Sequence, residues 1–422
     1  MTNTNNTTQQ PAQTTAATTA RLTTQELVFE LDSTQPVAQA PQMPPGLSNA
    51  GGTSAASKAT QAFNRFTPKL IPNYTCGQVF KKGEVGCAER VAAFFGDRLK
   101  FDATQQNWMF WSGKRWERDQ VGGIVECVKT VASHICDVEA PAMHALSQTP
   151  GDYHALQAKA LRDIGNRLHN KVSIYATVEL ARTIPALAVK HSDFDADPFL
   201  LNTLDGTVDL RDMSVRTHDR ADLLTSITPI PMSESSDGCP RWKQFLLEVM
   251  QGDTEMVSYL QRMVGYCLTG DTQEQVFFLL HGHGANGKSV FLNILQRLLG
   301  EYSKVADFTT FLDTNRGNAP RIDLASFVGK RLVVASESAQ GKQLDEAVLK
   351  SFTGGDVITA RELYKSFFEF KLVSKVVRAT IHKPKIQGTD YGIWRRMRLI
   401  PFLASFPEDK RDSQLEAKLT AE

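Results

Sequence analysis

A glycine-rich run carries the residues best suited to chemistry. The sequence HGHGANGKS at 281–289 fits the pattern G-x-x-x-x-G-K-S/T, with Gly282, Gly287, Lys288 and Ser289 at the fixed positions. Glycines let main-chain N–H groups turn inward around phosphates, Lys288 would reach the β- and γ-phosphates, and Ser289 would ligate Mg²⁺. The pattern predicts a phosphate-binding loop whose nucleotide contacts come from Gly282, Gly284, Ala285, Asn286, Gly287, Lys288 and Ser289.

The segments on either side of this run are those that such a loop requires. QVFFLL at 275–280 is continuously apolar and rich in β-forming residues, and VFLNILQRLL at 290–299 has the apolar spacing of a helix. The positive end of that helix would favour the same anion. A glycine turn without a ligand is the alternative, but four fixed positions arise by chance in such a chain only on the order of one or two times in a hundred.

An apolar strand further along the chain ends near an acidic residue. Leu332 to Ala335 form an apolar run, and Glu337 follows it, about 49 residues after Lys288. A carboxylate beside the phosphates would hold Mg²⁺ and polarise the attacking water. A glutamate that merely terminates a strand is the alternative. Because Glu337 follows a phosphate-binding pattern, it is the leading candidate for both roles.

Basic and aromatic residues alternate after this strand, a pattern that suits phosphate pairing and base stacking. The candidates for nucleic-acid contact are Lys350, Arg361, Tyr364 and Lys365, and a Trp-Arg-Arg run follows at 394–396. A solvated basic face is the alternative for any single lysine. Residues 275–402 hold 19 Lys and Arg against 11 Asp and Glu, whereas the rest of the chain holds 28 against 35. Positive charge is therefore gathered in this segment.

The composition is that of a globular protein close to neutrality. The 422 residues are 41% hydrophobic, and 47 Lys and Arg oppose 46 Asp and Glu. No apolar run approaches the ~18 residues of a membrane span, and the N-terminus has neither the basic nor the apolar region of a secretion signal. We therefore expect a cytoplasmic protein without a membrane partner.

The cysteines and histidines give little indication of a metal cluster. None of the six cysteines forms a C-x-x-C pair, and His134 with Cys136 and Cys127 is the nearest approach to a zinc site. Buried thiols in a reducing cytosol are the favoured interpretation.

Composition and periodicity also divide the chain. The first twenty residues hold eight threonines and no charge, which indicates disorder. We predict a helix at 83–95, a β-hairpin within 100–119, a helical block at 121–190 and small strands within 195–219. The predicted parts are a disordered leader at 1–60, an accessory domain at 61–235, an ATPase core at 241–407 and the start of a truncated C-terminal region at 408–422. The predicted fold class is α/β, a P-loop NTPase core with a central parallel sheet after a mostly helical accessory domain.

The order of these motifs resembles one family. After the glycine-rich run come VVASE (333–337), KSFTGGDVITAR (350–361), ATIHKP (379–384) and GTDYGIWRRMRLIPF (388–402). Together with NWMFWSGKRWERD (107–119) and DPFLLNTLDGTVDL (197–210), they resemble the superfamily 3 helicase domain and its preceding domain in the phage and plasmid primase/helicase family, satellite-phage type. The resemblance covers about residues 80–407.

This resemblance implies an AAA+-like homo-hexamer that hydrolyses ATP with Mg²⁺ and pulls single-stranded DNA through its pore during replication. Lys288 and Ser289 would bind triphosphate and Mg²⁺, Glu337 would activate water, and Arg395 or Arg396 would reach the next subunit's γ-phosphate. The segment that contacts DNA in the family matches Lys350, Arg361, Tyr364 and Lys365. Origin DNA and a separate primase in a bacterial host are the further partners implied for such a phage or prophage protein.

Departures from the family pattern leave a second function open. Ile381 stands where the family has an asparagine that orients water or senses the γ-phosphate, and isoleucine cannot hydrogen-bond. The chain ends at Glu422, before the tail usual in relatives, and residues 1–80 are too short and polar for a primase half. The alternative is therefore a non-hydrolysing remnant or assembly factor that binds nucleotide and DNA. A small-molecule kinase is disfavoured because it needs no basic, aromatic-rich segment.

Overall fold

A computed structural model describes residues 80–232, 238–312, 323–335, 344–361, 367–382 and 391–422. All of them belong to one compact unit, Ser54–Glu422. The predicted leader at 1–60, Glu337, Tyr364 and Lys365 lie outside the described residues. No described helix is long and apolar enough to cross a membrane.

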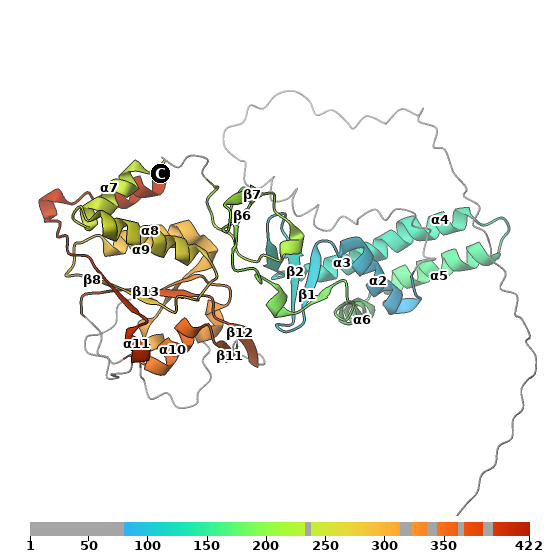
Figure 1. The fold of residues 1–422 in the computed structure, drawn as a ribbon. Helices are drawn as coiled ribbons and strands as arrows, with labels where there is room; N and C mark the ends of the chain where they lie inside the picture. The colour runs from blue at the N-terminus through green and yellow to red at the C-terminus, as the bar shows by residue number, and fades with distance from the viewer. Residues whose placement is uncertain (1–79, 233–237, 313–322, 336–343, 362–366, 383–390) are drawn as a thin grey trace, which may run out of the picture. The chain divides into compact units, whose positions relative to one another are not determined.

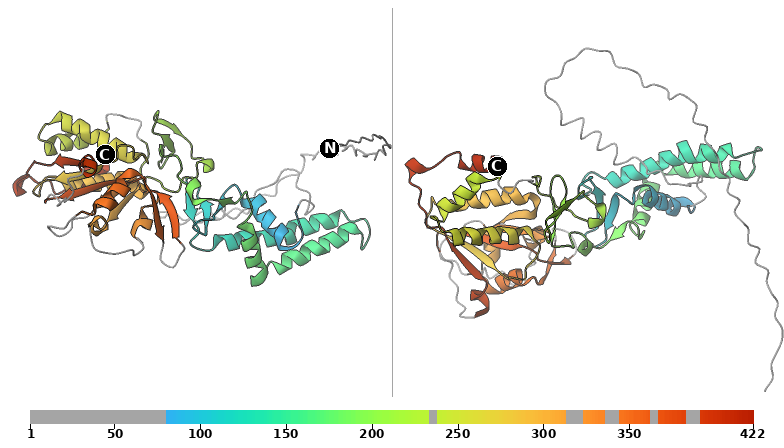
Figure 2. Two further views of the ribbon diagram at one scale, coloured as in Figure 1. Left: turned by 60° about the horizontal axis from the view of Figure 1, so that its bottom comes forward. Right: turned by 45° about the horizontal axis from the view of Figure 1, so that its top comes forward.

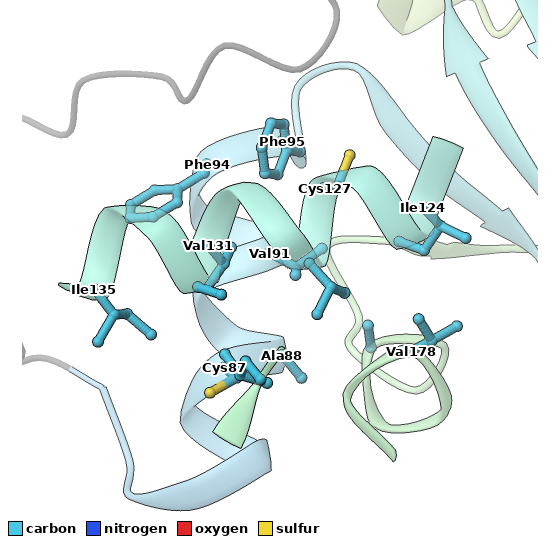
Figure 3. Close-up of a cluster of buried hydrophobic side chains, with 14 of the residues drawn as sticks. Cys87, Ala88, Val91, Phe94, Phe95, Ile124, Cys127, Val131, Ile135 and Val178 are labelled. Carbon is cyan, nitrogen blue, oxygen red and sulfur yellow. The ribbon is translucent and has the colours of Figure 1, made fainter. Parts of the chain in front are cut away.

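The first part of the fold is mostly helical, as the sequence predicts. Its elements are α2 (Gly83–Phe95), β1 (Leu99–Asp102), β2 (Asn107–Trp111), β3 (Trp116–Arg118), α3 (Gly123–His134), a π-helical turn (Ile135–Glu139), α4 (Ala140–Ala145), α5 (Tyr153–Arg167), α6 (Lys171–Ala181) and β4 (Ala188–Val189). Apolar side chains of α2, α3 and α6 meet in one cluster (Figure 3). The strands form a sheet in the order β3-β2-β1-β4.

The predicted hairpin within 100–119 is confirmed and extended by one strand. β2 and β3 pair antiparallel across the turn at residues 112–115, and β1 adds a second antiparallel partner for β2. Asp102 makes the extra turn, because its Oδ1 accepts hydrogen bonds from the N–H groups of Thr104 and Gln105 at 3.0 and 2.9 Å. This side chain-to-backbone turn is a known property of aspartate that the alternation of apolar residues does not reveal.

Three short strands come next, as predicted: β5 (Leu200–Asn202), β6 (Thr207–Asp209) and β7 (Ser214–Arg216). They form an antiparallel sheet in that order. Leu201 and Val208 are buried in the same apolar cluster as residues of the following part.

The remaining elements build a five-stranded sheet and its covering helices. They are α7 (Pro240–Val249), α8 (Thr254–Leu268), β8 (Phe277–His281), α9 (Lys288–Leu299), β9 (Ser303–Ala306), β10 (Leu332–Ala335), α10 (Glu346–Gly354), β11 (Val357–Arg361), β12 (Phe367–Lys371), β13 (Lys375–Thr380), α11 (Tyr391–Trp394), β14 (Met397–Pro401) and α12 (Leu415–Ala421). The sheet order is β14-β8-β13-β10-β9, and every neighbouring pair is parallel.

The parallel sheet is covered on both faces, which explains why its strands are continuously apolar. Side chains alternate across β8: Phe278 and Leu280 join the cluster beneath α8 and α9, whereas Phe277 and Leu279 join the cluster beneath α10 and the β11–β12 hairpin. Figures 1 and 2 show α8 and α9 on one face of the sheet and α10 on the other. The α/β class with a central parallel sheet is therefore confirmed.

Candidate functional site

The glycine-rich loop, residues 282–287, joins the carboxyl end of β8 to the first residue of α9. Gly287 occupies the N-cap position of α9 with φ of 84°, and Gly284 has φ of 89°. A side chain is strained at such φ values, so glycine is the residue that lets the chain turn here. The loop thus presents the positive N-terminal end of a twelve-residue helix.

The first glycine of the loop lies in a close approach between neighbouring strands. A Cβ atom on Gly282 would lie 2.2 Å from the carbonyl oxygen of Phe402 and 2.2 Å from Nδ2 of Asn286. The Gly282 N–H donates to the carbonyl of Thr380 at 3.2 Å. The loop is therefore fixed against the ends of β13 and β14, the two strands that flank β8.

Lys288 is the buried cation of the site. Its side chain is 6% exposed, and its Nζ donates to the carbonyl of Gly282 at 2.7 Å and to Oδ1 of Asn286 at 2.9 Å. The ammonium thus folds back across the loop. Ser289, one residue later in the first turn of α9, is exposed. Lysine offers three donors, so it can exchange these loop acceptors for the oxygens of an anion.

A cleft of about 520 Å³ opens beside this loop. Its walls are the loop, the N-terminal half of α9 and the carboxyl ends of β10 and β13. The predicted residues that line it are Gly284, Ala285, Asn286, Gly287, Lys288, Ser289 and Ile381. Gly282 does not line the cleft but lies at the close approach between the loop and Phe402. The structure therefore brings the loop and Ile381 together, as predicted.

The topology of the sheet also favours this cleft as a ligand site. The chain leaves β8 towards β9 at the far edge, whereas it leaves β13 in the other direction, towards β14. Ligands of open parallel sheets bind outside the carboxyl ends of the strands, at the point where the connections from two neighbouring strands run in opposite directions. That point lies between β8 and β13, where the cleft opens.

Glu337 is untested because it lies outside the described residues. Val334 and Ala335, the last residues of β10, line the cleft. The position of Glu337 two residues later therefore stays a prediction.

Arg395 and Arg396 lie at the other end of the sheet from the loop. They precede β14, whose first residue, Met397, pairs with the first residue of β8, Phe277. Five strand residues separate that end from the loop, a distance of ~16 Å at about 3.3 Å per residue. Arg395 Nη2 donates to Oε1 of Gln275 at 2.5 Å. The two arginines therefore do not reach the cleft of their own chain.

The predicted nucleic-acid residues fall on two neighbouring elements. Lys350 lies on α10 and is half-buried, and Arg361 ends β11, with its guanidinium 5.2 Å from the centre of the Phe367 ring. β11 and β12 pair antiparallel from Val357–Lys371 to Arg361–Phe367. Phe367 and Val357 are 58% and 63% exposed, so the hairpin presents apolar as well as basic side chains to solvent.

Other residues that line or support the cleft are not among the predicted site residues. Asn293 and Gln296 of α9 line the cleft, and Phe402 contacts the loop from beyond β14. Phe402 lies 116 residues from Asn286 in the chain, so only the strand order reveals their proximity. The spacing of Asn293 and Gln296 after Ser289, at four and seven residues, is that of one helix face and could have indicated them.

An α/β protein with a glycine-rich loop at the switch point of a parallel sheet is the class that the fold and the site define. Two family models match the chain: D5 N terminal like at residues 88–251, and a family of unknown function, DUF5906, at residues 280–396. The first includes the helical part and the three-stranded sheet, and the second begins at the end of β8.

Curated relatives are viral. A putative helicase of Acanthamoeba polyphaga mimivirus is 31% identical over 51% of this chain and 23% of that protein. A putative helicase of Invertebrate iridescent virus 3 is 24% identical over 64% and 31%, and a putative primase of African swine fever virus is 24% identical over 37% and 17%. The chain spans less than a third of the length of these relatives. Over the matched parts, the chain is therefore similar to viral proteins described as putative helicases and primases.

An alignment with a solved structure has low sequence identity and a low TM-score. The apo structure of the NrS-1 C-terminal region aligns with a TM-score of 0.46 and 11% identity, covering 76% of this chain and 63% of that one.

Proposed function

We propose that this chain is an ATP-dependent DNA helicase of a phage or other mobile element, which hydrolyses ATP to translocate on single-stranded DNA during replication. The observation that carries the proposal is the buried Lys288 at the floor of a cleft at the switch point of the sheet. Viral helicase and primase relatives support the same class of enzyme.

The donor set around the cleft suits a nucleoside triphosphate. The loop turns through two positive-φ glycines at the N-terminal end of α9, and Lys288 adds a full positive charge. The hydroxyl of Ser289 and the carboxylate of Glu337 would hold Mg²⁺, which would neutralise charge on the phosphates. The part played by Lys288 is to leave the Gly282 carbonyl and Asn286 and donate to phosphate oxygens.

DNA and a ring partner are the further parts of the proposal. The exposed face of the β11–β12 hairpin would contact single-stranded DNA, with Lys350, Arg361, Tyr364 and Lys365 supplying charge and stacking. Because Arg395 and Arg396 lie a strand length from their own cleft, they would serve the cleft of a neighbouring subunit in a homo-hexamer. Origin DNA and a separate primase complete the proposed partners.

Ile381 favours a second candidate function. It is 37% exposed and lines the cleft at the end of β13, where its side chain offers neither a donor nor an acceptor to a water molecule. A site that lacks a hydrogen-bonding side chain at this position would bind nucleotide and DNA without efficient hydrolysis. The second candidate is therefore a replication assembly factor that carries nucleotide.

Steady-state ATP hydrolysis, with and without single-stranded DNA, tests the proposal and separates the two candidates. The variants are Lys288→Ala, Ile381→Asn and a control, Ile230→Asn, whose parent side chain is also 37% exposed but does not line the cleft. For a helicase we expect DNA-stimulated turnover in the parent and none in Lys288→Ala. Turnover that appears only in Ile381→Asn supports the assembly factor. ATP binding unchanged by Lys288→Ala would refute the nucleotide site itself.

A further inference from the structure

The segment after β14 contacts the glycine-rich loop at three points. This segment, residues 402–406, is called the clamp segment below. The N–H of Phe402 donates to the carbonyl of His281 at 2.7 Å, and the N–H of Phe406 donates to the carbonyl of Ala285 at 2.9 Å. The carbonyl of Phe402 accepts a hydrogen bond from Nδ2 of Asn286 at 3.0 Å. The clamp segment therefore follows the chain from His281, the last residue of β8, to Asn286, the fifth residue of the loop.

Asn286 connects this segment to the cation of the site. Its side chain is 3% exposed, and its amide donates to the Phe402 carbonyl while its Oδ1 accepts from Nζ of Lys288 at 2.9 Å. A lysine has only donors, and a main-chain carbonyl only accepts. A residue that bonds to both must offer an acceptor to one and a donor to the other. The carboxamide of asparagine does this, whereas the aspartate carboxylate of the same shape has no donor for the carbonyl.

The two hydrogen bonds of this amide depend on each other. An ammonium on the amide oxygen polarises the group and strengthens its N–H donor, as in other chains of buried hydrogen bonds. When phosphate takes Lys288, the amide loses that polarisation, and its bond to Phe402 weakens. The same displacement frees the amide to rotate, because only one of its two partners then holds it.

We propose that Asn286 is a positioning residue that couples occupation of the loop by phosphate to the clamp segment, so that phosphate binding loosens residues 402–406. The proposal rests on the proposed nucleotide function of the loop. The release would be transmitted to α12, which follows the clamp segment and contacts α9 through Asn293 Nδ2 and Glu416 Oε2 at 3.0 Å. Nucleotide state would thereby change the packing of the end of this chain.

Hydrogen exchange of the peptide that covers residues 402–406 measures the coupling directly, in the full chain. Without nucleotide, we expect Asn286→Ala to accelerate exchange of the Phe406 N–H roughly fivefold, the factor that one net hydrogen bond is worth. Lys288→Ala should accelerate it by a smaller factor, because the amide retains a weakened bond to Phe402. The double variant should exchange no faster than Asn286→Ala alone, because both changes break one chain of bonds. Asn286→Asp, which retains the acceptor and loses the donor, should match Asn286→Ala.

MgATP should reproduce the Lys288→Ala effect in the parent chain and have no further effect on the clamp segment of Asn286→Ala. Gln296→Ala is the matched control, since it removes an amide from the same cleft that donates to the Leu292 carbonyl and not to the clamp segment or α12, and its clamp exchange should equal that of the parent. The coupling would be overturned if the accelerations of exchange added in the double variant, or if the clamp segment of Asn286→Asp exchanged at the parent rate. Failure of the parent to bind MgATP overturns the proposed function and the nucleotide-driven step, whereas binding without a clamp response overturns this proposal alone.

Discussion

Lys375, the first residue of β13, is a buried cation whose charge state should control stability above neutral pH. Its side chain is 2% exposed, and its Nζ donates to the main-chain carbonyls of Thr269, Asp271 and Val373, the last two at 3.2 Å. Burial lowers the pKa of Lys375 to about 7, although the neighbouring Cys267 acts in the opposite direction. An unfolded lysine retains its proton until about pH 10.4.

The sign of the pH dependence follows from these two values. Between pH 7 and about 10.4 the unfolded chain binds a proton that the folded chain has released, so the free energy of unfolding rises with pH, by up to about 1.4 kcal/mol per unit. Below pH 7 both states are protonated, and the folded state bears the full cost of a buried charge. The slope cannot exceed this value, because one group releases at most one proton.

Lys375→Met should remove this contribution while retaining most of the buried volume. We expect the parent to gain about 2 kcal/mol of stability over the variant between pH 7 and pH 9, on the linkage slope above. Urea unfolding of the full chain, followed by tryptophan fluorescence at several pH values, measures the difference. Lys371→Met removes an exposed lysine and should show no such divergence. Parallel parent and Lys375→Met stability curves over this range would refute a lowered pKa.

Two further substitutions test the close packing of the loop and the buried ion pair of the helical part. Gly282→Ala places a Cβ 2.2 Å from the Phe402 carbonyl and should weaken binding of a fluorescent ATP analogue at least tenfold, on the order of 1.4 kcal/mol. Gly265→Ala is the control, because its Cβ would meet nothing within 4 Å, and it should bind the analogue normally. Equal binding by the two variants would contradict the reasoning. Arg90→Met leaves the buried Glu139 unpaired and should destabilise by about 3–5 kcal/mol in thermal unfolding, whereas adding Glu139→Leu should restore most of that loss. A double variant as unstable as the single one would argue against an uncompensated charge.

The elements that the sequence predicts well are those with local causes. The helix at 83–95 and the strand at 332–335 have the predicted bounds, because apolar spacing and turn residues determine them within a few positions. The glycine-rich loop could be predicted for the same reason, since its residues are contiguous. The extra strand β1 could not, because its turn depends on one aspartate side chain rather than on periodicity.

Long-range contacts explain what the sequence could not provide. The bond between Asn286 and Phe402 exists because β14 is the neighbour of β8 in the sheet, and no local pattern specifies strand order. Likewise, the number of residues between the loop and Arg395 does not predict which end of the sheet Arg395 occupies. The parallel pairing of β14 with β8 decides that question and places Arg395 at the end of the sheet away from the loop, so its expected role in the cleft of a neighbouring subunit stays a prediction.

Burial changes the meaning of the positive charge in residues 275–402. Among the described residues of this segment, the basic side chains of Lys288, Arg331, Lys375 and Arg378 are less than 9% exposed. Arg331 donates to the carbonyls of Leu268 and Leu200, both at 2.5 Å, so its charge stabilises the fold. Only charges in contact with solvent can replace the counterions of a nucleic acid. These four charges are therefore structural or belong to the cleft, and the proposed DNA contact depends on solvent-exposed cations and on stacking by residues such as Phe367.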